Sequence, residues 1–176
     1  MTNVINLNSY RVTGKEKVLL DANILLYLFG PFNGANDYGY SNFLEKALIN
    51  GTEMYVNESV ISEFINRNCR LAYEQYLRNN TLKRYDFSYK KHYRTTENFK
   101  RNYNLSIDIV KTEILTIAKF SSNCNKEMNK GLLSAELLDF NDELIVRNAE
   151  CNGLGIVTHD RDFITHSSSI DVFQYS

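Results

Sequence analysis

Short apolar runs alternate with segments of helical periodicity along most of this chain, and this alternation is what most constrains its fold. Runs at Val18–Leu20, Met54–Val56, Leu154–Thr158 and Ile170–Phe173 have the length and composition of buried strands. Strands that alternate with helices form a parallel sheet with helices on both faces. We therefore predict an α/β fold, a three-layer α/β/α sandwich with a short, mainly parallel central sheet.

The predicted helices fill the intervals between these strands. They run from about Asn23 to Gly30, over Ser41–Asn50, from about Ser59, near Leu105–Phe120 and from about Asn141 to Cys151. A chain of 176 residues has room for one domain of ordinary size. We assign that domain to residues 17–176 and treat the mostly polar residues 1–16 as an N-terminal extension.

The composition indicates a cytoplasmic protein with no membrane partner. Cys69, Cys124 and Cys151 are odd in number and widely spaced, so we interpret them as structural residues in a reducing compartment. The N-terminus has no pattern of a signal peptide. The longest apolar run, Ile24–Phe29, is far shorter than the roughly 20 residues that cross a bilayer.

Four acidic residues stand where predicted elements begin or end. Asp21 and Asp160 each follow a predicted strand, while Glu63 and Asp142 lie in the first turns of predicted helices. Ligands of such sheets bind at strand ends, so the four carboxylates are expected to converge on one edge. Clustered carboxylates repel one another unless a cation compensates, which indicates a hard divalent metal such as Mg²⁺ or Mn²⁺. The pattern predicts metal-assisted hydrolysis of a phosphodiester.

Each acid also has a simpler interpretation. Asp21 and Asp142 could cap the helices that they precede or begin. Glu63 could lie on a solvated helix face, and Asp160 and Asp162 could belong to a surface turn. All of these interpretations would have to hold together, so the joint prediction of a site is stronger than any single residue.

The segments that carry these acids resemble the PIN-domain nucleases. The resemblance rests on Leu19–Leu26, Ser59–Glu63, Asn141–Ala149 and Gly155–Phe163, whose last segment contains the pattern T-x-D-x-D-F. It implies a PIN-like fold and a ribonuclease that uses one or two Mg²⁺ or Mn²⁺ ions, as in the toxins of VapBC-type toxin-antitoxin pairs. A small antitoxin protein and a homodimer are the partners that it implies besides RNA.

The resemblance also implies a set of site residues. The catalytic and metal-binding residues would be Asp21, Glu63, Asp142 and Asp160. Asp162 is an additional candidate ligand, and Asp139 is a weaker reserve. Asn23 and Thr158 match polar positions that support such a site by orienting carboxylates or water.

The middle of the chain is basic and aromatic. Residues 70–104 contain nine basic and three acidic residues, a net charge of +6, whereas the remaining residues sum to −7 and the whole chain to −1. Cations that neutralise phosphates beside rings that stack on bases suit single-stranded RNA. The predicted RNA-binding residues are Lys83, Arg84, Lys90, Lys91, Arg94, Lys100 and Arg101. The aromatic residues among them are Tyr73, Tyr76, Tyr85, Phe87, Tyr89, Tyr93, Phe99 and Tyr103. In the alternative interpretation, these tyrosines pack inside a helical hairpin and the cations are only solvated.

The sequence thus predicts a metal-dependent endoribonuclease that hydrolyses RNA phosphodiester bonds, with the toxin of a toxin-antitoxin pair as one form of it. A non-catalytic RNA-binding module with a PIN-like fold is the main alternative. A metal-dependent phosphatase fits less well, because Asp21-Ala22-Asn23 lacks a second aspartate two residues after a nucleophile.

Overall fold

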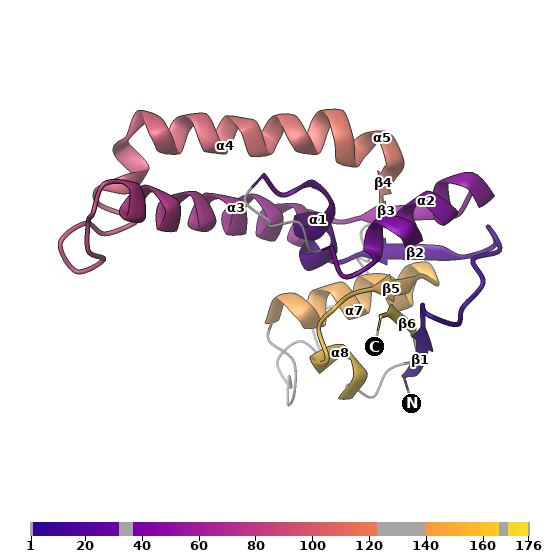
Figure 1. The fold of residues 1–176 in the computed structure, drawn as a ribbon. Coiled ribbons are helices and arrows are strands. Elements are labelled where there is room, and N and C mark those ends of the chain that lie inside the picture. Colours follow the sequence, from indigo (N-terminus) through magenta and orange to yellow (C-terminus); the bar gives the residue numbers. More distant parts are fainter. Residues whose placement is uncertain (1, 32–36, 123–139, 166–168, 176) are drawn as a thin grey trace.

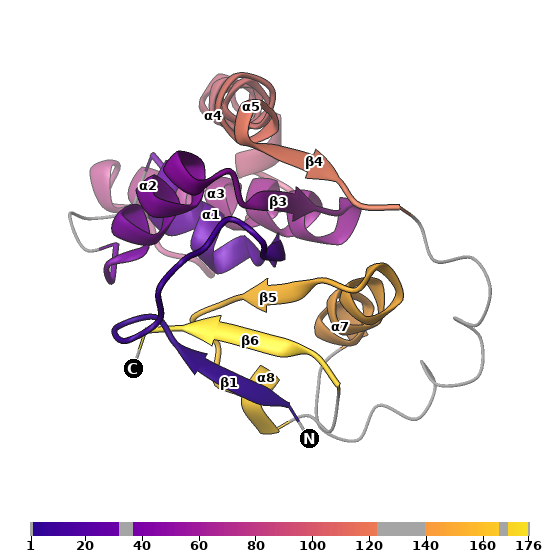
Figure 2. The same ribbon diagram turned by 90° about the vertical axis from the view of Figure 1, so that its right-hand side faces the viewer.

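The centre of the protein is a six-stranded sheet (Figure 1, Figure 2). The computed structural model describes residues 2–31, 37–122, 140–165 and 169–175. In spatial order the strands are β1 (Asn3–Asn6), β6 (Asp171–Gln174), β5 (Gly155–Val157), β2 (Lys17–Leu20), β3 (Glu53–Val56) and β4 (Ala118–Phe120). All five strand pairings are parallel, which confirms the predicted fold class.

Helices flank this sheet. They are α1 (Ala22–Phe29), α2 (Tyr40–Asn50), α3 (Glu58–Asn79), η1 (Tyr93–Thr95), α4 (Glu97–Ile109), the π-helical turn η2 (Val110–Ile114), α5 (Leu115–Ile117), α7 (Phe140–Asn152) and α8 (Asp162–Thr165). The chain moves outward from β2 to β3 and β4 and then returns to β5 and β6, so right-handed crossovers put the two groups of helices on opposite faces. Within the described ranges, no helix is long and apolar enough to cross a membrane.

The main hydrophobic core lies around the central strand β2. Val18, Leu19 and Leu20 are at most 1% exposed, as expected for a strand that is covered on both faces. Ile24 of α1 and Phe64 of α3 are fully buried in the same core. The central strand β2 and its first crossover helices therefore follow from apolar periodicity alone.

Two strands have no apolar signal in the sequence. β1 pairs with β6 at one edge of the sheet, so the N-terminal extension contributes a strand, and the neighbouring Leu7 and Val12 are buried. At the other edge, Ala118–Phe120 forms β4 and pairs with β3, whereas we predicted a helix there. Both strands are short, and apart from Ala118 every position in them is exposed or only partly buried, which leaves no alternating pattern to recognise.

The cysteines differ in state. Cys69 is buried and has a free thiol, and Cys151 is disulfide-bonded. Cys124 lies outside the described residues. A disulfide is unusual in a reducing compartment, so the cytoplasmic location stays a prediction.

The helices α3 and α4 form an antiparallel hairpin that extends well beyond the sheet, to the left in Figure 1. We call its far part, residues 70–103, the hairpin tip. The tip has a hydrophobic cluster of its own, separate from the main core, in which Ala72, Tyr73, Leu77 and Tyr93 are buried. The molecule therefore has two packed regions of very different size.

Candidate active site

The candidate site lies where the order of strands in the sheet reverses. β2 and β5 are central neighbours, and the chain leaves them toward opposite edges, which is the position where ligands bind in open α/β sheets. Asp21 follows β2 directly, and its backbone N–H donates to the Val157 carbonyl of β5 at 3.0 Å. The acid is thereby held beside the end of the neighbouring strand.

Asp21 is held by hydrogen bonds to both of its carboxylate oxygens. Oδ1 accepts from the backbone N–H of Ala22 at 2.6 Å, so Asp21 caps α1. Oδ2 accepts from the Thr158 hydroxyl at 2.7 Å. The capping interpretation of Asp21 is therefore confirmed, and a cap leaves oxygen lone pairs free for other ligands.

Thr158 connects the two strand ends. Its fully buried hydroxyl donates to Asp21 and accepts from Asn23 Nδ2 at 3.2 Å and from the Asp160 backbone N–H at 3.0 Å. Asn23 Oδ1 in turn accepts from the His159 backbone N–H at 3.2 Å. One threonine thus uses its complete hydrogen-bonding capacity to set Asp21 and Asp160 relative to each other.

The carboxylate of Asp21 is influenced by two other acids at this edge. Asp21 is 4% exposed, and burial raises its pKa to about 6. The negative charges of Glu63 and Asp160 also raise this pKa, while the hydrogen bonds from Thr158 and Ala22 lower it. We call Asp21, Glu63 and Asp160, with Asn23 and Thr158, the carboxylate edge.

Glu63 comes from the early part of α3, a helix capped by Asn57, whose Oδ1 accepts from Val60 N–H at 2.9 Å. Arg67, one turn further along, places its Nε 3.2 Å from a Glu63 carboxylate oxygen. Arg67 brings a positive charge close to the carboxylate edge, and the sequence motifs gave no indication of it.

Asp160 and Asp162 form a local turn at the start of α8. Asp160 Oδ1 accepts from the Asp162 backbone N–H at 2.9 Å, and Asp162 is exposed. The turn interpretation is therefore confirmed for this pair, although Asp160 still acts electrostatically on Asp21. A role of Asp162 as an additional ligand stays a prediction.

Asp142 lies in the first turn of α7 and is half-buried. The acid beside it, Glu143, is only 5% exposed, and its carboxylate lies 2.6 Å from Arg147 Nη2. The pair joins a buried acid to a half-buried arginine at helical i,i+4 spacing, and we did not predict it. Asp139, the reserve ligand, lies outside the described residues.

A divalent metal would have to be bound through few protein ligands here. Among the described residues, no three histidine, cysteine, aspartate or glutamate side chains lie close enough together to form a ready metal cage. Mg²⁺ is commonly bound by one or two carboxylates and retains several waters, so converging acids without a cage fit such an ion. Burial is the main cause of the raised pKa of Asp21, and the charges of Glu63 and Asp160 add to it; a nearby cation would relieve that added repulsion.

The basic residues predicted to bind RNA lie at the hairpin tip. All seven are exposed, and within the described part of the chain only Arg84 and Lys100 form ion pairs, with Glu74 at 2.7 Å and with Glu97 at 2.6 Å. The other members of this set, which we call the tip cations, are Lys83, Lys90, Lys91, Arg94 and Arg101. Their charges are available to a polyanion.

Most tyrosines of the tip are packed against one another. Tyr93 is fully buried, and its ring centroid lies 5.3 Å from those of Tyr73 and Tyr76 and 5.8 Å from those of Tyr89 and Phe99. Tyr73 and Tyr93 are buried, so the hairpin-packing alternative is confirmed for them, while base stacking by the half-buried Tyr76, Phe87, Tyr89 and Phe99 stays a prediction. Tyr85 and Tyr103 are exceptions, at 78% and 43% exposed.

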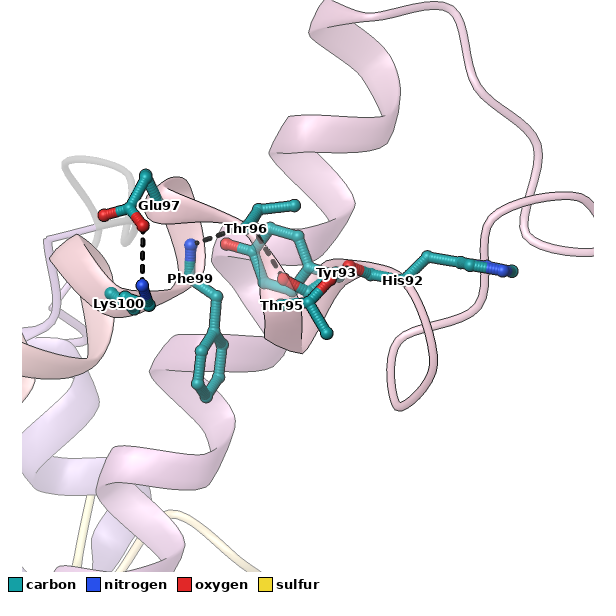
Figure 3. A network of polar contacts seen from close by, with 7 residues as sticks. All are labelled: His92, Tyr93, Thr95, Thr96, Glu97, Phe99 and Lys100. Atoms are coloured by element: carbon teal, nitrogen blue, oxygen red, sulfur yellow. Dashed lines mark hydrogen bonds and ion pairs between the residues drawn. The ribbon is translucent and has the colours of Figure 1, made fainter.

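Capping interactions fix the start of α4 at the tip (Figure 3). The Thr96 hydroxyl accepts from the Phe99 backbone N–H at 3.1 Å and donates to the Tyr93 carbonyl at 2.7 Å. Lys100 pairs with Glu97 on the exposed side of the same turn. The helix therefore begins at Glu97, earlier than the apolar pattern predicted.

With this geometry the sequence can be placed in a family. The chain matches the PIN domain over residues 18–167, a span that contains every acid of the candidate site. The chain belongs to the PIN domain family. PIN domains are generally nucleases and typically use divalent metals, which supports nuclease activity here.

One solved structure with a similar fold is the crystal structure of VapBC2 from Rickettsia felis bound to a DNA fragment from their promoter. The TM-score is 0.55 at 15% sequence identity, and the match covers 91% of this PIN domain chain and 99% of that chain. At this identity the likeness shows the fold alone. No curated protein matches the sequence.

Proposed function

We propose that this PIN domain protein is a metal-dependent endoribonuclease that hydrolyses RNA phosphodiester bonds. The observation that carries the proposal is the buried Asp21, whose pKa is raised at the point where the strand order reverses, with Glu63 and Asp160 acting on it. Asp21, Glu63, Asp142 and Asp160 are the proposed catalytic metal ligands, with Asp162 as an additional ligand. Mg²⁺ or Mn²⁺ is the proposed cofactor.

The residues of the chain would prepare the site before substrate arrives. Thr158 and Ala22 hold both oxygens of Asp21, and Asn23 holds Thr158, so the ligand carboxylate is oriented by neighbours that do not themselves bind metal. Arg67 offsets part of the charge of Glu63. A bound divalent cation would neutralise the phosphodiester and favour deprotonation of the attacking water.

RNA would be bound largely by charge. The tip cations are exposed and free of ion pairs among the described residues, so each can neutralise a phosphate. Arg84 and Lys100 are part of the proposed surface as well, although each would exchange an acidic partner for RNA. The rings of the tip support this surface mainly by building the hairpin that presents the cations.

We also propose that the protein is the toxin of a toxin-antitoxin pair, with a small antitoxin as partner, and that it forms a homodimer. The fold shared with a VapBC complex supports the proposal. So does a pocket of about 320 Å³ between α3, α4 and β4, lined by Ile61, Ile65, Tyr103 and Phe120 among others. Tyr103 and Phe120 are 43% and 49% exposed and would be covered by an apolar segment of the partner. Co-purification of a small protein after expression of the native operon, together with the mass of the complex, tests this assignment.

The test of the nuclease proposal is cleavage of structured and unstructured RNA with Mg²⁺ or Mn²⁺, by the purified protein and by Asp21→Asn and Asp142→Asn. Loss of a proposed ligand should reduce the rate by more than about 100-fold. The matched control is Asp86→Asn, which removes an exposed acid at the hairpin tip. Full activity in Asp21→Asn would refute the assignment, and RNA binding without cleavage in the unmodified protein would favour the non-catalytic RNA-binding module.

A further inference from the structure

An aromatic cluster borders the carboxylate edge. Its centre is His159, which lies in the chain between Thr158 and Asp160. The His159 ring centroid is 4.4 Å from that of Tyr38, 5.6 Å from that of Tyr27 and 5.9 Å from that of Tyr40. Thr158 and Asp160 both belong to the carboxylate edge, so the aromatic cluster adjoins the carboxylates.

The imidazole of His159 is held in one orientation. Tyr40 donates its only hydroxyl hydrogen to the Thr158 carbonyl at 2.8 Å, and its oxygen lies 3.3 Å from His159 Nδ1. Because the hydroxyl hydrogen is already committed, Nδ1 is assigned as the protonated nitrogen and donates to Tyr40. The backbone of His159 is fixed as well, through Asn23. His159 is thus a rigid support for the rings that contact it.

The most exposed of these rings is Tyr38, which is 45% exposed although it packs on His159 at an interplanar angle of 32° and on Tyr27 at a centroid distance of 4.8 Å. Its backbone has a φ of 54°, a conformation that a bulky residue rarely adopts and that costs free energy. Asp37 stabilises the turn, because its carboxylate accepts from the Gly39 and Ser41 backbone N–H groups at 3.0 and 3.1 Å. The fold therefore keeps a large ring at the surface instead of burying it in the core.

We propose that Tyr38, supported by His159, binds one unpaired nucleobase of the RNA substrate by stacking, next to the phosphate that is cleaved. This inference rests on the proposed function and specifies its substrate, since only a single strand, loop or bulge can offer an unstacked base. Base stacking on an aromatic ring is tolerant of sequence and is strong enough to position a strand. The tip cations would hold phosphates at a distance, while Tyr38 sets which linkage enters the carboxylate edge.

The experiment measures whether the loss of one base and the loss of the Tyr38 ring are coupled. Asp21→Asn serves as an uncleavable background, and the probe is a short fluorescein-labelled single-stranded RNA in which one abasic nucleotide is moved along the chain. With Tyr38 present, an abasic nucleotide at one position should weaken binding about tenfold in fluorescence anisotropy. Tyr38→Asn removes the ring, and asparagine tolerates a positive φ, so this variant should fold. In this variant, no position of the abasic nucleotide should weaken binding in this way.

Two controls separate the ring from other effects. Tyr38→Phe keeps the ring and should retain the penalty, whereas Tyr85→Asn removes an exposed ring at the hairpin tip and should leave the penalty at that position unchanged. Equal abasic profiles for Tyr38 and Tyr38→Asn would overturn the inference even if the protein cleaves RNA. A coupled position in a protein that never cleaves RNA would support base binding and overturn the proposed nuclease function instead.

Discussion

The carboxylate edge and the hairpin tip differ in what holds their polar groups. At the carboxylate edge, Asp21 and Thr158 are buried and hydrogen-bonded to each other from distant segments of the chain. At the tip, Lys90 and Lys91 are exposed, and what is buried beneath them is a set of rings. The first region fixes charges at defined points, and the second only presents charges on a rigid support.

This difference separates two tasks that a nuclease must perform. Chemistry requires groups positioned within a fraction of an ångström, which buried hydrogen bonds provide. Retention of a polyanion requires only a local excess of positive charge, which an exposed surface provides. Glu63 and Arg78 lie on the same helix α3, and the helical rise separates them by about 22 Å. The two regions are therefore joined by one rigid element but act at different points of the substrate.

The largest expected effect is the loss of the aromatic cluster of the tip. Tyr93→Ala removes a fully buried ring and should cost about 3–5 kcal/mol of local stability. We expect hydrogen exchange to become fast in the tip while the amides of β2 and β5 remain protected. Tyr93→Phe, which loses the hydrogen bond to Asn98 Oδ1 but keeps the ring, is the matched control and should cost about 0.5–1.5 kcal/mol. Equal loss of protection in both regions would show that they unfold as one unit.

A smaller effect is expected from the hydroxyl that connects the two strand ends. Thr158→Val keeps the shape of the side chain but removes the donor to Asp21 and the acceptor for Asn23 and the Asp160 N–H. RNA cleavage should fall about 10–100-fold, while the affinity for RNA in the absence of metal stays the same. Thr158→Ser keeps the hydroxyl and should retain most of the activity. Unchanged cleavage in Thr158→Val would mean that Asp21 needs no orientation.

The double charge reversal Lys90→Glu and Lys91→Glu tests how much the tip cations contribute to RNA binding. It should raise the KM for long RNA about tenfold and flatten the dependence of log K on log salt by about 0.7 for each cation lost. A dinucleotide has a single phosphodiester bond and too few phosphates to occupy the carboxylate edge and the tip together, so its cleavage should change much less. Lys46→Glu, an exposed reversal on α2, is the control. An equal effect on short and long RNA would indicate that the tip acts on the fold instead of on the substrate.

The same contrast explains what could be predicted from the sequence. Asp21, Thr158 and Asp160 follow buried apolar strands, and the rule that strand ends meet at one edge is enough to bring them together. Tertiary contacts between distant segments determine the burial of Glu143 and the packing of Tyr38 on His159. The periodicity of the sequence does not predict such contacts. For the tip, composition was compatible with exposed or buried rings, and only the packing decided between them.

The smallest expected effect is the response of the metal-free protein to pH. Burial raises the pKa of Asp21 from 3.8 to about 6, so the folded state binds a proton more tightly than the unfolded state. The free energy of unfolding in EDTA should therefore rise as the pH falls from about 7 to about 4. Burial acts to raise the pKa of Glu16 too, but hydrogen bonds from Thr13 and Tyr10 lower it to about 2. Glu16 therefore makes the free energy of unfolding fall as the pH falls, but only below about pH 4.5.

Denaturant unfolding at pH 7 and pH 5 measures this rise in the free energy of unfolding. Asp21→Asn should abolish the rise, and Asp86→Asn, at the exposed tip, should leave it intact. Saturating Mg²⁺ should also reduce the rise, because the cation and the proton compete for the same carboxylate. If Asp86→Asn removed the rise as fully as Asp21→Asn, the pH response would belong to the general charge of the protein, and the electrostatic contrast between the two regions would be lost.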